Sequence, residues 1–187
     1  MRYSTSVAPI LSMSTGIRTH VMELPEAESV NTLLWEQFLA ARDDPALQRS
    51  HYFAGRYENI YIPETRMPAL APVLQAARQG AECYLGKPVA GLSTGFWFNE
   101  MGPGHATLPH HHDEDDEQVS GVYYIRVPDD SGDLLLKQGE DCQRITPREG
   151  MFVFFSPKVV HEVTRNNSDS VRLSVGMNFG VGSGPES

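Results

Sequence analysis

Hydrophobic residues recur at helical spacing in two segments of the N-terminal half of the chain. In residues 26–41 they form one stripe, made of Val30, Leu33, Leu34, Phe38 and Ala41. A second stripe runs through residues 68–85 and stops before Gly86, a residue typical of the position after a helix. Gly80 falls inside that stripe and weakens the helix locally. The pattern predicts two amphipathic helices.

After Gly86 the pattern changes to short apolar runs separated by turn sequences. The runs are GFWFNEM, HATLPHHH, SGVYYIRV, GDLLLKQ, ITP, GMFVFFS, HEVTR and VRLSVGMNF. The turn sequences between them include GPG, PDDSG, PREG and NNSD. Many short strands at near-regular spacing are typical of a β-sandwich or jelly roll. We therefore predict a mainly β fold with N-terminal helices.

The segment between the two predicted helices, 55-GRYENIYIP-63, alternates like a strand. Arg56, Glu58 and Asn59 make it unusually polar for a buried strand. The composition favours an exposed edge strand, and the alternative is a strand that contacts substrate at the mouth of the β core.

The chain reads as a single domain over residues 1–187, because it contains no internal repeat and no low-complexity linker. Residues 1–16 and 181–187 are rich in small and polar residues, and we expect them to be flexible. Between these ends, residues 17–91 form the helical part and residues 92–180 form the β core.

The charge and the cysteines narrow the class of protein. The formal net charge is −9, which argues against nucleic acid as a partner, because phosphate binding needs clustered Lys and Arg. Cys83 and Cys142 are too few and too far apart for a disulfide framework or a thiolate zinc site. The sequence lacks a signal peptide and an apolar stretch of membrane-spanning length. We expect a cytoplasmic protein with no membrane partner.

The stretch 108-LPHHHDEDDEQ-118 places three imidazoles beside a run of carboxylates. A solvated acidic loop would explain the carboxylates but not the imidazoles. A His-x-Asp or His-x-Glu pair followed by a distant His is the ligand pattern of mononuclear non-haem iron sites. His111 and Asp113 supply such a pair, and His161 follows the strand GMFVFFS. The pattern therefore predicts an iron site.

Arg172 lies in the last apolar run, where strand alternation places it opposite to Leu173, Val175 and Met177. A guanidinium that points into a β core is costly unless an anion pairs with it. A bound dicarboxylate would satisfy it, and Ser174 points the same way and can add a hydroxyl contact.

These residues carry a resemblance to a known family. The His cluster, 120-SGVYYI-125, 132-GDLLL-136, 147-PREGMFVFFSPKVVHEV-163 and 172-RLSVGMN-178 resemble the iron(II)- and 2-oxoglutarate-dependent dioxygenases. The similarity is greatest to a bacterial and phage group of these oxygenases and more distant to prolyl hydroxylases. It implies a double-stranded β-helix core, with Fe(II), 2-oxoglutarate and O2 as cofactor and co-substrates. It also implies that Arg172, Ser174 and Tyr124 hold the distal carboxylate of 2-oxoglutarate, and that the N-terminal half shapes substrate choice.

The resemblance leaves three registers open for the first metal ligands. Many members of the bacterial group read His-x-His-Pro and a short loop before the Ser-Gly-Val-Tyr-Tyr sequence. Counting back from Ser120 without a gap gives His112 with Glu114, one extra loop residue gives His111 with Asp113, and two give His110 with His112. We prefer His111 with Asp113, because Asp is the commoner partner in the superfamily and its short side chain suits a strand end.

The resemblance implies an oxygenase, most simply a hydroxylase that releases succinate and CO2. Related halogenases lack the metal carboxylate, so a nearby Asp or Glu favours hydroxylation. We expect the substrate to be a small molecule, an amino acid or a short peptide. Its candidate contacts are Arg56, Glu58, Asn59, Trp97, Asn99 and Asn178, while His51 and His105 are taken as incidental. The alternatives are a cupin-type three-histidine dioxygenase without 2-oxoglutarate and a non-catalytic jelly-roll protein that binds a metal or a carboxylate.

Overall fold

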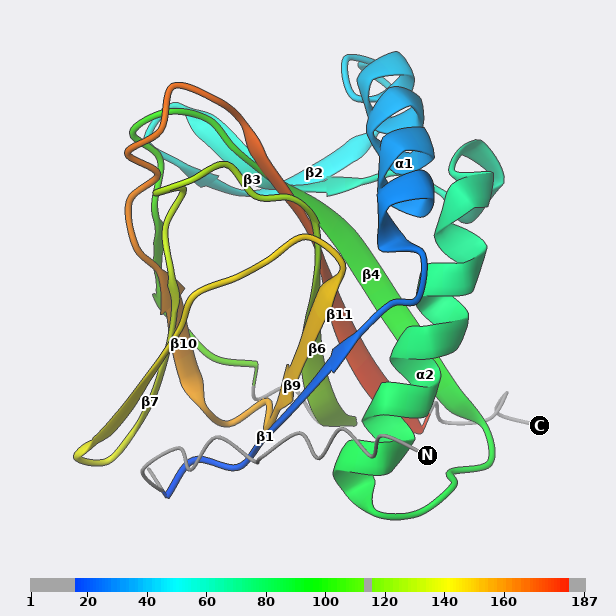
Figure 1. Cartoon of the computed structure of the whole chain (residues 1–187), viewed down its shortest axis with the longest axis vertical. Helices are drawn as coiled ribbons and strands as arrows, with labels where there is room; N and C mark the ends of the chain where they lie inside the picture. The colour runs from blue at the N-terminus through cyan, green and yellow to red at the C-terminus, as the bar shows by residue number, and fades with distance from the viewer. Residues whose placement is uncertain (1–15, 113–115, 182–187) are drawn as a thin grey trace, which may run out of the picture.

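The computed structural model describes residues 16–112 and 116–181, which form two facing β-sheets with two helices packed outside the larger one (Figure 1). The helices are α1 (Ala27–Ala41) and α2 (Ala71–Leu85), with short 3-10 turns at Glu64–Arg66 and Pro68–Leu70. The strands are β1 (Thr19–Glu23), β2 (Gln48–Phe53), β3 (Arg56–Tyr61), β4 (Leu92–Met101), β5 (Thr107–His110), β6 (Glu117–Arg126), β7 (Leu134–Gln138), β8 (Asp141–Ile145), β9 (Met151–Phe155), β10 (Val160–Val163) and β11 (Arg172–Val181). The chain ends that we expected to be flexible lie largely outside the described residues.

Both predicted helices are present, and α2 ends as the sequence indicates. Gly86 follows α2 with φ 73°, a left-handed conformation that glycine adopts without steric cost. Gly80 lets α2 approach the sheet closely, since a Cβ there would lie 2.3 Å from the Phe154 ring. None of the helices in the described part of the chain is long and apolar enough to cross a membrane.

The larger sheet has the strand order β1-β9-β6-β11-β4-β3-β2. β11 lies near its centre and pairs antiparallel with β6 on one side and β4 on the other. One face of the sheet packs against α1 and α2 through buried side chains that include Leu173, Val175 and Met177. This confirms the predicted alternation of β11 and turns Arg172 and Ser174 toward the inside of the fold.

The smaller sheet has the order β5-β10-β7-β8 and faces the inner side of the larger one (Figure 1). A second cluster of buried apolar residues fills part of the space between the sheets: Ile17, Tyr124, Leu134, Leu136, Met151, Val153, Phe155 and Val159. Seven of the eight predicted runs after Gly86 form strands, whereas β8 lies earlier than the run ITP and shares only Ile145 with it. The mainly β jelly-roll fold is confirmed.

Two strands in the N-terminal half were not predicted, and they change the reading of the segment at residues 55–63. β1 extends the larger sheet beside β9, and β2 pairs with β3. Since β3 also pairs with β4, it is not an edge strand as its polar composition suggested. Glu58 and Asn59 are buried on β3 because they face the interior of the fold rather than solvent.

Candidate metal and co-substrate site

A cavity lies between the two sheets and contains most of the side chains that the sequence nominated. Its walls come from β2, β3, β4, β6 and β11 on the larger sheet and from β5, β7 and β10 on the smaller one. Histidines gather at one part of the wall, and Arg172 lies at another. We call these the histidine end and the arginine end of the cavity.

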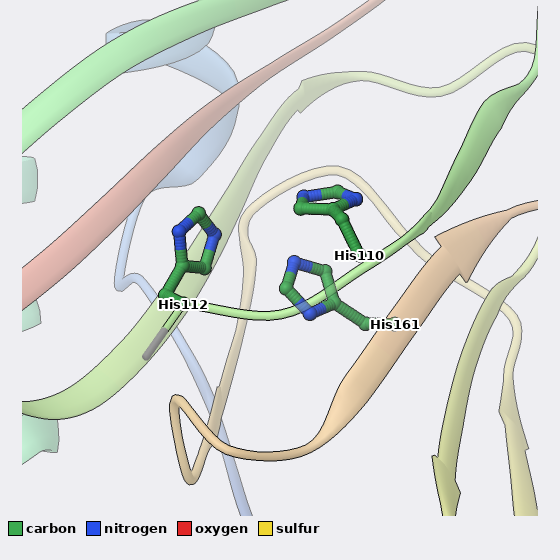
Figure 2. A group of neighbouring side chains, drawn as sticks. All are labelled: His110, His112 and His161. Atoms are coloured by element: carbon green, nitrogen blue, oxygen red, sulfur yellow. The ribbon is translucent and has the colours of Figure 1, made fainter. Parts of the chain in front are cut away.

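The histidine end consists of His110, His112 and His161. His110 is the last residue of β5, His112 follows two residues later, and His161 lies on β10 as the cross-strand neighbour of His110. One ring nitrogen from each residue lies within 4.8 Å of the other two. Figure 2 shows the three rings turned toward a common space, two from one segment and one from β10. The spacing suits three ligands of one metal ion.

Main-chain carbonyls orient two of these rings. His110 Nδ1 lies 2.8 Å from the carbonyl oxygen of Leu108, and His161 Nδ1 lies 3.1 Å from that of Val159. A carbonyl can only accept, so each Nδ1 must carry the proton and donate it. In the neutral form of each ring Nε2 is then unprotonated and free to bind a metal, and such a partner is common behind a metal-binding imidazole.

Burial keeps His112 and His161 uncharged. Together with the neighbouring His110, it lowers the pKa of His161 to about 3 and that of His112 to about 4. A neutral imidazole is the form that binds metals. Imidazole nitrogen is a good ligand for iron, so this donor set fits Fe(II).

The structure describes all the residues of only one of the three ligand registers. It brings together the residues of the His110 and His112 register with His161. His111 lies outside this group, and its residue is exposed. Asp113 and Glu114 lie outside the described residues, so the pairings of His111 with Asp113 and of His112 with Glu114 stay predictions.

Arg172 occupies the other end of the cavity and is only 1 % exposed. Its Nη1 donates to the main-chain oxygens of Gly132 at 2.6 Å and Ser131 at 3.2 Å. Its Nε has no hydrogen-bond partner among the described residues. Burial lowers the pKa of the guanidinium, but arginine stays charged in proteins. The Asp133 carboxylate acts on Arg172 electrostatically, but it forms its ion pair with Arg144 at 2.6 Å, so a bound anion would complete the surroundings of the buried cation.

Tyr124 and Ser174 stand beside Arg172, as the sequence predicted from different arguments. The Arg172 guanidinium lies over the Tyr124 ring, 5.1 Å from its centroid, and Ser174 is the cross-strand neighbour of Tyr124. The Tyr124 hydroxyl is buried, and apart from its interaction with the Arg172 guanidinium it has no hydrogen-bond partner in the described part of the chain. Burial raises its pKa, so the hydroxyl keeps its proton and can donate it. These groups fit a carboxylate.

The candidate substrate contacts divide into two sets. Glu58, Asn59, Trp97, Asn99 and Asn178 line the cavity, whereas Arg56 does not. Arg56 instead pairs with the Glu58 carboxylate at 3.1 Å and donates to the main chain at Glu100 and Ala106. Trp97 packs beside His112, with ring centroids 5.7 Å apart. Arg56 is therefore placed to support Glu58.

His51 is the residue that sequence reasoning missed. It lines the cavity and hydrogen-bonds to Asn59, although nothing in its sequence context distinguishes it from His105. The signal is conformational, because His51 has φ 56° inside a strand. His105 fits its expected incidental role, since its Nδ1 accepts from the Gly102 N–H and the residue does not line the cavity.

Comparison with known proteins bears on the same residues. Residues 96–180 match the family model described as the 2OG-Fe(II) oxygenase superfamily, where 2OG is 2-oxoglutarate. The match runs from β4 to β11 and contains both ends of the cavity, so the family resemblance of the sequence is confirmed. None of the curated proteins that were compared matches the chain.

Solved structures share the whole fold. A prolyl-4-hydroxylase from Pseudomonas putida is 22% identical with a TM-score of 0.71, covering 89% of this chain and 94% of its own. A viral collagen prolyl hydroxylase from Paramecium Bursaria Chlorella virus-1 is 12% identical with a TM-score of 0.64, covering 97% and 98%. The epimerase SnoN of nogalamycin biosynthesis, in complex with Fe3+, alpha ketoglutarate and nogalamycin RO, is 17% identical with a TM-score of 0.63, covering 86% and 77%. At these identities the likeness establishes the fold.

Proposed function

We propose that this chain, whose residues 96–180 match the model of the 2OG-Fe(II) oxygenase superfamily, is a hydroxylase. The superfamily uses Fe(II), 2-oxoglutarate and O2. In the proposed reaction one oxygen atom of O2 enters a C–H bond of the substrate, and the other enters 2-oxoglutarate, which leaves as succinate and CO2. The observation that carries the proposal is one cavity with a triad of histidines at one end and, at the other, a buried arginine whose Nε has no hydrogen-bond partner among the described residues.

His110, His112 and His161 are our proposed iron ligands. The support is their mutual spacing and the two carbonyls that accept from Nδ1 of His110 and His161 and so direct Nε2 of each ring to the metal. The pairings of His111 with Asp113 and of His112 with Glu114, which would supply the carboxylate that favours hydroxylation, stay predictions beside this proposal, because Asp113 and Glu114 lie outside the described residues. When bound there, the iron supplies the redox chemistry, and the protein holds the ligands and keeps the site inside a walled cavity.

Arg172, Tyr124 and Ser174 are our proposed binding site for the far carboxylate of 2-oxoglutarate. Arg172 offers a charged donor, and Tyr124 offers a hydroxyl without another partner. Charge-assisted hydrogen bonds of this kind are about twice as strong as neutral ones. The two ends of the cavity would then bind the two ends of one dicarboxylate.

The substrate is proposed to be a small molecule, an amino acid or a short peptide. Glu58, Asn59, Trp97, Asn99 and Asn178 are its proposed contacts, since they line the rest of the cavity. Arg56 would act through Glu58. Pseudomonas putida prolyl-4-hydroxylase and SnoN, which share the fold, carry names that indicate different substrates, so the fold alone does not choose among these classes.

Anaerobic addition of Fe(II) and 2-oxoglutarate tests the proposal directly. Bidentate chelation by 2-oxoglutarate produces a visible charge-transfer band, and we expect it to form with the wild-type protein. Asp113→Ala and Glu114→Ala should both keep their iron and the band if the three histidines are the ligands. Loss of iron in either variant would transfer the assignment to the register that contains that carboxylate.

A second candidate function is favoured by the three-histidine set itself. Cupin-type dioxygenases hold their metal with three histidines and do not use 2-oxoglutarate. That function would leave the buried Arg172 guanidinium without an anion, so it accounts for one end of the cavity only. Oxygen uptake that is independent of 2-oxoglutarate, together with no charge-transfer band, would select it over the first candidate.

A further inference from the structure

His51 has a backbone conformation that its position in a strand does not explain. The β2–β3 register runs from Ser50 opposite Asn59 to Tyr52 opposite Tyr57, and His51 between them is unpaired with φ 56°. The hairpin turn lies further on, at Ala54 and Gly55. Left-handed backbone at a residue other than glycine costs on the order of 1–3 kcal/mol and is concentrated at functional sites. The strain at His51 accompanies a side chain that lines the cavity.

A row of polar side chains connects His51 with the arginine end. Ser174 on β11 is opposite Asn99 on β4, Asn99 is opposite Asn59 on β3, and Asn59 is opposite Ser50 on β2. Residues that are directly opposite on neighbouring strands place their side chains on the same face of a sheet. The row therefore crosses the inner face of the larger sheet from the proposed co-substrate site to the β2–β3 hairpin.

Hydrogen bonds along this row have one possible direction. Asn99 Nδ2 lies 3.1 Å from the main-chain oxygen of Glu58, which fixes the amide, because a carbonyl only accepts. The same nitrogen donates to Asn59 Oδ1 at 2.8 Å, so Asn59 must turn Nδ2 toward His51. Asn59 Nδ2 then donates to His51 Nδ1 at 2.9 Å. His51 Nδ1 is thereby an acceptor, and a neutral His51 carries its proton on Nε2.

Ser50 does not reverse this direction. Its Oγ lies 2.8 Å from His51 Nδ1 and 3.0 Å from the Tyr61 hydroxyl, and a serine hydroxyl can donate to either. A proton on Nδ1 would face the Asn59 amide protons, and that arrangement is repulsive. The wall therefore offers a donor at His51 Nε2. It also offers an acceptor at Asn99 Oδ1, since the hydrogen bonds of Asn99 use only its nitrogen.

The charge of the cavity wall favours an uncharged group opposite this donor and acceptor. Arg172 is the one arginine or lysine among the described lining residues, and the proposed function assigns it to 2-oxoglutarate. The Glu58 carboxylate already has Arg56 as its partner at 3.1 Å. His51 itself is exposed, so a charged substrate group at this wall would lose only part of its hydration, but it would gain no counter-charge. An amide carries both an acceptor and a donor and is neutral.

We propose that His51 is a specificity-determining residue that donates an Nε2–H hydrogen bond to an uncharged amide of the substrate, held in that tautomer by Asn99 and Asn59. The proposal rests on the proposed function and deepens it by naming the substrate class. Asn99 Oδ1 accepts from the N–H of the same amide. His51 selects the substrate and takes no part in the oxidation itself.

The tautomer is measured first, without any substrate. Protein labelled with 15N at histidine and loaded with Zn(II) and 2-oxoglutarate should show His51 with an unprotonated Nδ1 and a protonated Nε2. In Asn59→Leu the two tautomers should mix, because the donor to Nδ1 is gone. A protonated Nδ1 in the wild-type protein would contradict the proposed direction of the hydrogen bonds from Asn99 through Asn59 to His51.

Substrate recognition is tested with amino acids capped as N-acetyl amides and with the same amino acids uncapped. Succinate formation above the substrate-free background should appear with capped amides, and product masses should rise by one oxygen. His51→Leu should raise the KM for the best capped amide about tenfold and change kcat less than about threefold. His51→Gln, which keeps an N–H donor, should recover part of the loss. Tyr52→Leu is the matched control, because Tyr52 is the exposed neighbour of His51 outside the cavity, and its KM should not change.

The charge-transfer band distinguishes failure of the amide proposal from failure of the proposed oxygenase function. If the band forms in all variants but no capped amide stimulates succinate formation, the amide assignment is overturned and the oxygenase is not. If His51→Leu keeps the wild-type KM, the role of His51 is overturned. If the wild-type protein gives no band, the proposed function fails, and the inference about its substrate fails with it.

Discussion

The two ends of the cavity are built from different kinds of structure. The arginine end lies on β6 and β11, long neighbouring strands inside the larger sheet. The histidine end lies on β5 and β10, each of four residues, and on the segment just after β5. Sheet register places Arg172, Ser174 and Tyr124 side by side. At the histidine end, carbonyls of nearby residues orient His110 and His161.

The two ends of the cavity also differ in how far they are exposed to solvent. The arginine end is sealed, with Arg172 and Tyr124 fully buried, which suits the proposed binding of a carboxylate. The histidine end is more open, since His110 and His112 are partly exposed while His161 is 9 % exposed. A metal site for oxygen chemistry needs open positions, and a carboxylate site gains strength from exclusion of water. If the ends are independent, each can be removed while the other is kept.

The largest effect is expected at the histidine end, from His161→Ala. His161 is the ligand that the metal registers share, and its loss should lower iron affinity more than about 100-fold and abolish turnover. His111→Ala is the matched control, because His111 lies outside the triad, and it should keep its iron. Iron content after anaerobic loading and desalting checks both. Equal loss of iron in the two variants would return the assignment to the pairing of His111 with Asp113.

Arg172→Ala should remove the arginine end and leave the histidine end intact. We expect 2-oxoglutarate to bind about 100-fold more weakly, on the order of 3 kcal/mol, with unchanged iron binding. Without 2-oxoglutarate the free energy of unfolding should stay equal or increase, because the variant no longer buries a cation that lacks an anion. Titration of the charge-transfer band and urea unfolding measure the two effects.

Arg126→Ala is the control for Arg172→Ala. Arg126 is on the next strand and lies over the Trp35 ring outside the cavity, 4.5 Å from its centroid. Its removal should not alter 2-oxoglutarate affinity. If both arginine variants bind 2-oxoglutarate as the wild type does, the carboxylate site is elsewhere.

The comparison also explains what the sequence could predict. The period of two along a strand determines which face a residue occupies, so the inward position of Arg172 and Ser174 followed from their apolar neighbours. The helix stripes and the run of strands after Gly86 followed from periodicity in the same way. The position of Tyr124 came from the family resemblance, and sheet register places it beside Ser174.

The histidine end was harder because the triad continues past the last residue of β5. Beyond a strand end, side-chain direction depends on local contacts, such as the bond from the His112 N–H to the Pro157 oxygen, and not on a period. Three adjacent histidines therefore gave three registers. β3 was misread because Glu58 and Asn59 are polar yet buried, and the partner that makes this possible, Arg56, acts only in three dimensions. The place of His51 in the cavity wall accompanies a left-handed backbone angle, which cannot be predicted from the residue type.

Gly176→Ala should disturb the wall between the two ends. A Cβ at Gly176 would lie 2.5 Å from the Trp97 ring, which packs beside His112. The partly buried indole of Trp97 would have to shift to make room, so we expect the free energy of unfolding to fall by about 1–3 kcal/mol. Gly95→Ala is the matched control on β4, where the nearest atom to a new Cβ is 4.0 Å away. Similar unfolding curves for the two variants would show that Trp97 does not need the space above Gly176.

The smallest effects should come from two neighbouring tyrosines on β6. One variant should change 2-oxoglutarate affinity without changing stability, and the other should do the reverse. Tyr124→Phe removes a buried hydroxyl that, apart from Arg172, has no hydrogen-bond partner among the described residues, so stability should hold while 2-oxoglutarate affinity falls about fivefold, or about 1 kcal/mol. Tyr123→Phe removes the donor to Asn31 Oδ1 at 2.7 Å on the helix side of the sheet. It should lower the free energy of unfolding by about 1–2 kcal/mol and leave 2-oxoglutarate affinity unchanged. Urea unfolding of both variants measures the stability, and titration of the charge-transfer band measures the affinity for 2-oxoglutarate. If Tyr124→Phe binds 2-oxoglutarate normally, Arg172 holds the carboxylate without the tyrosine.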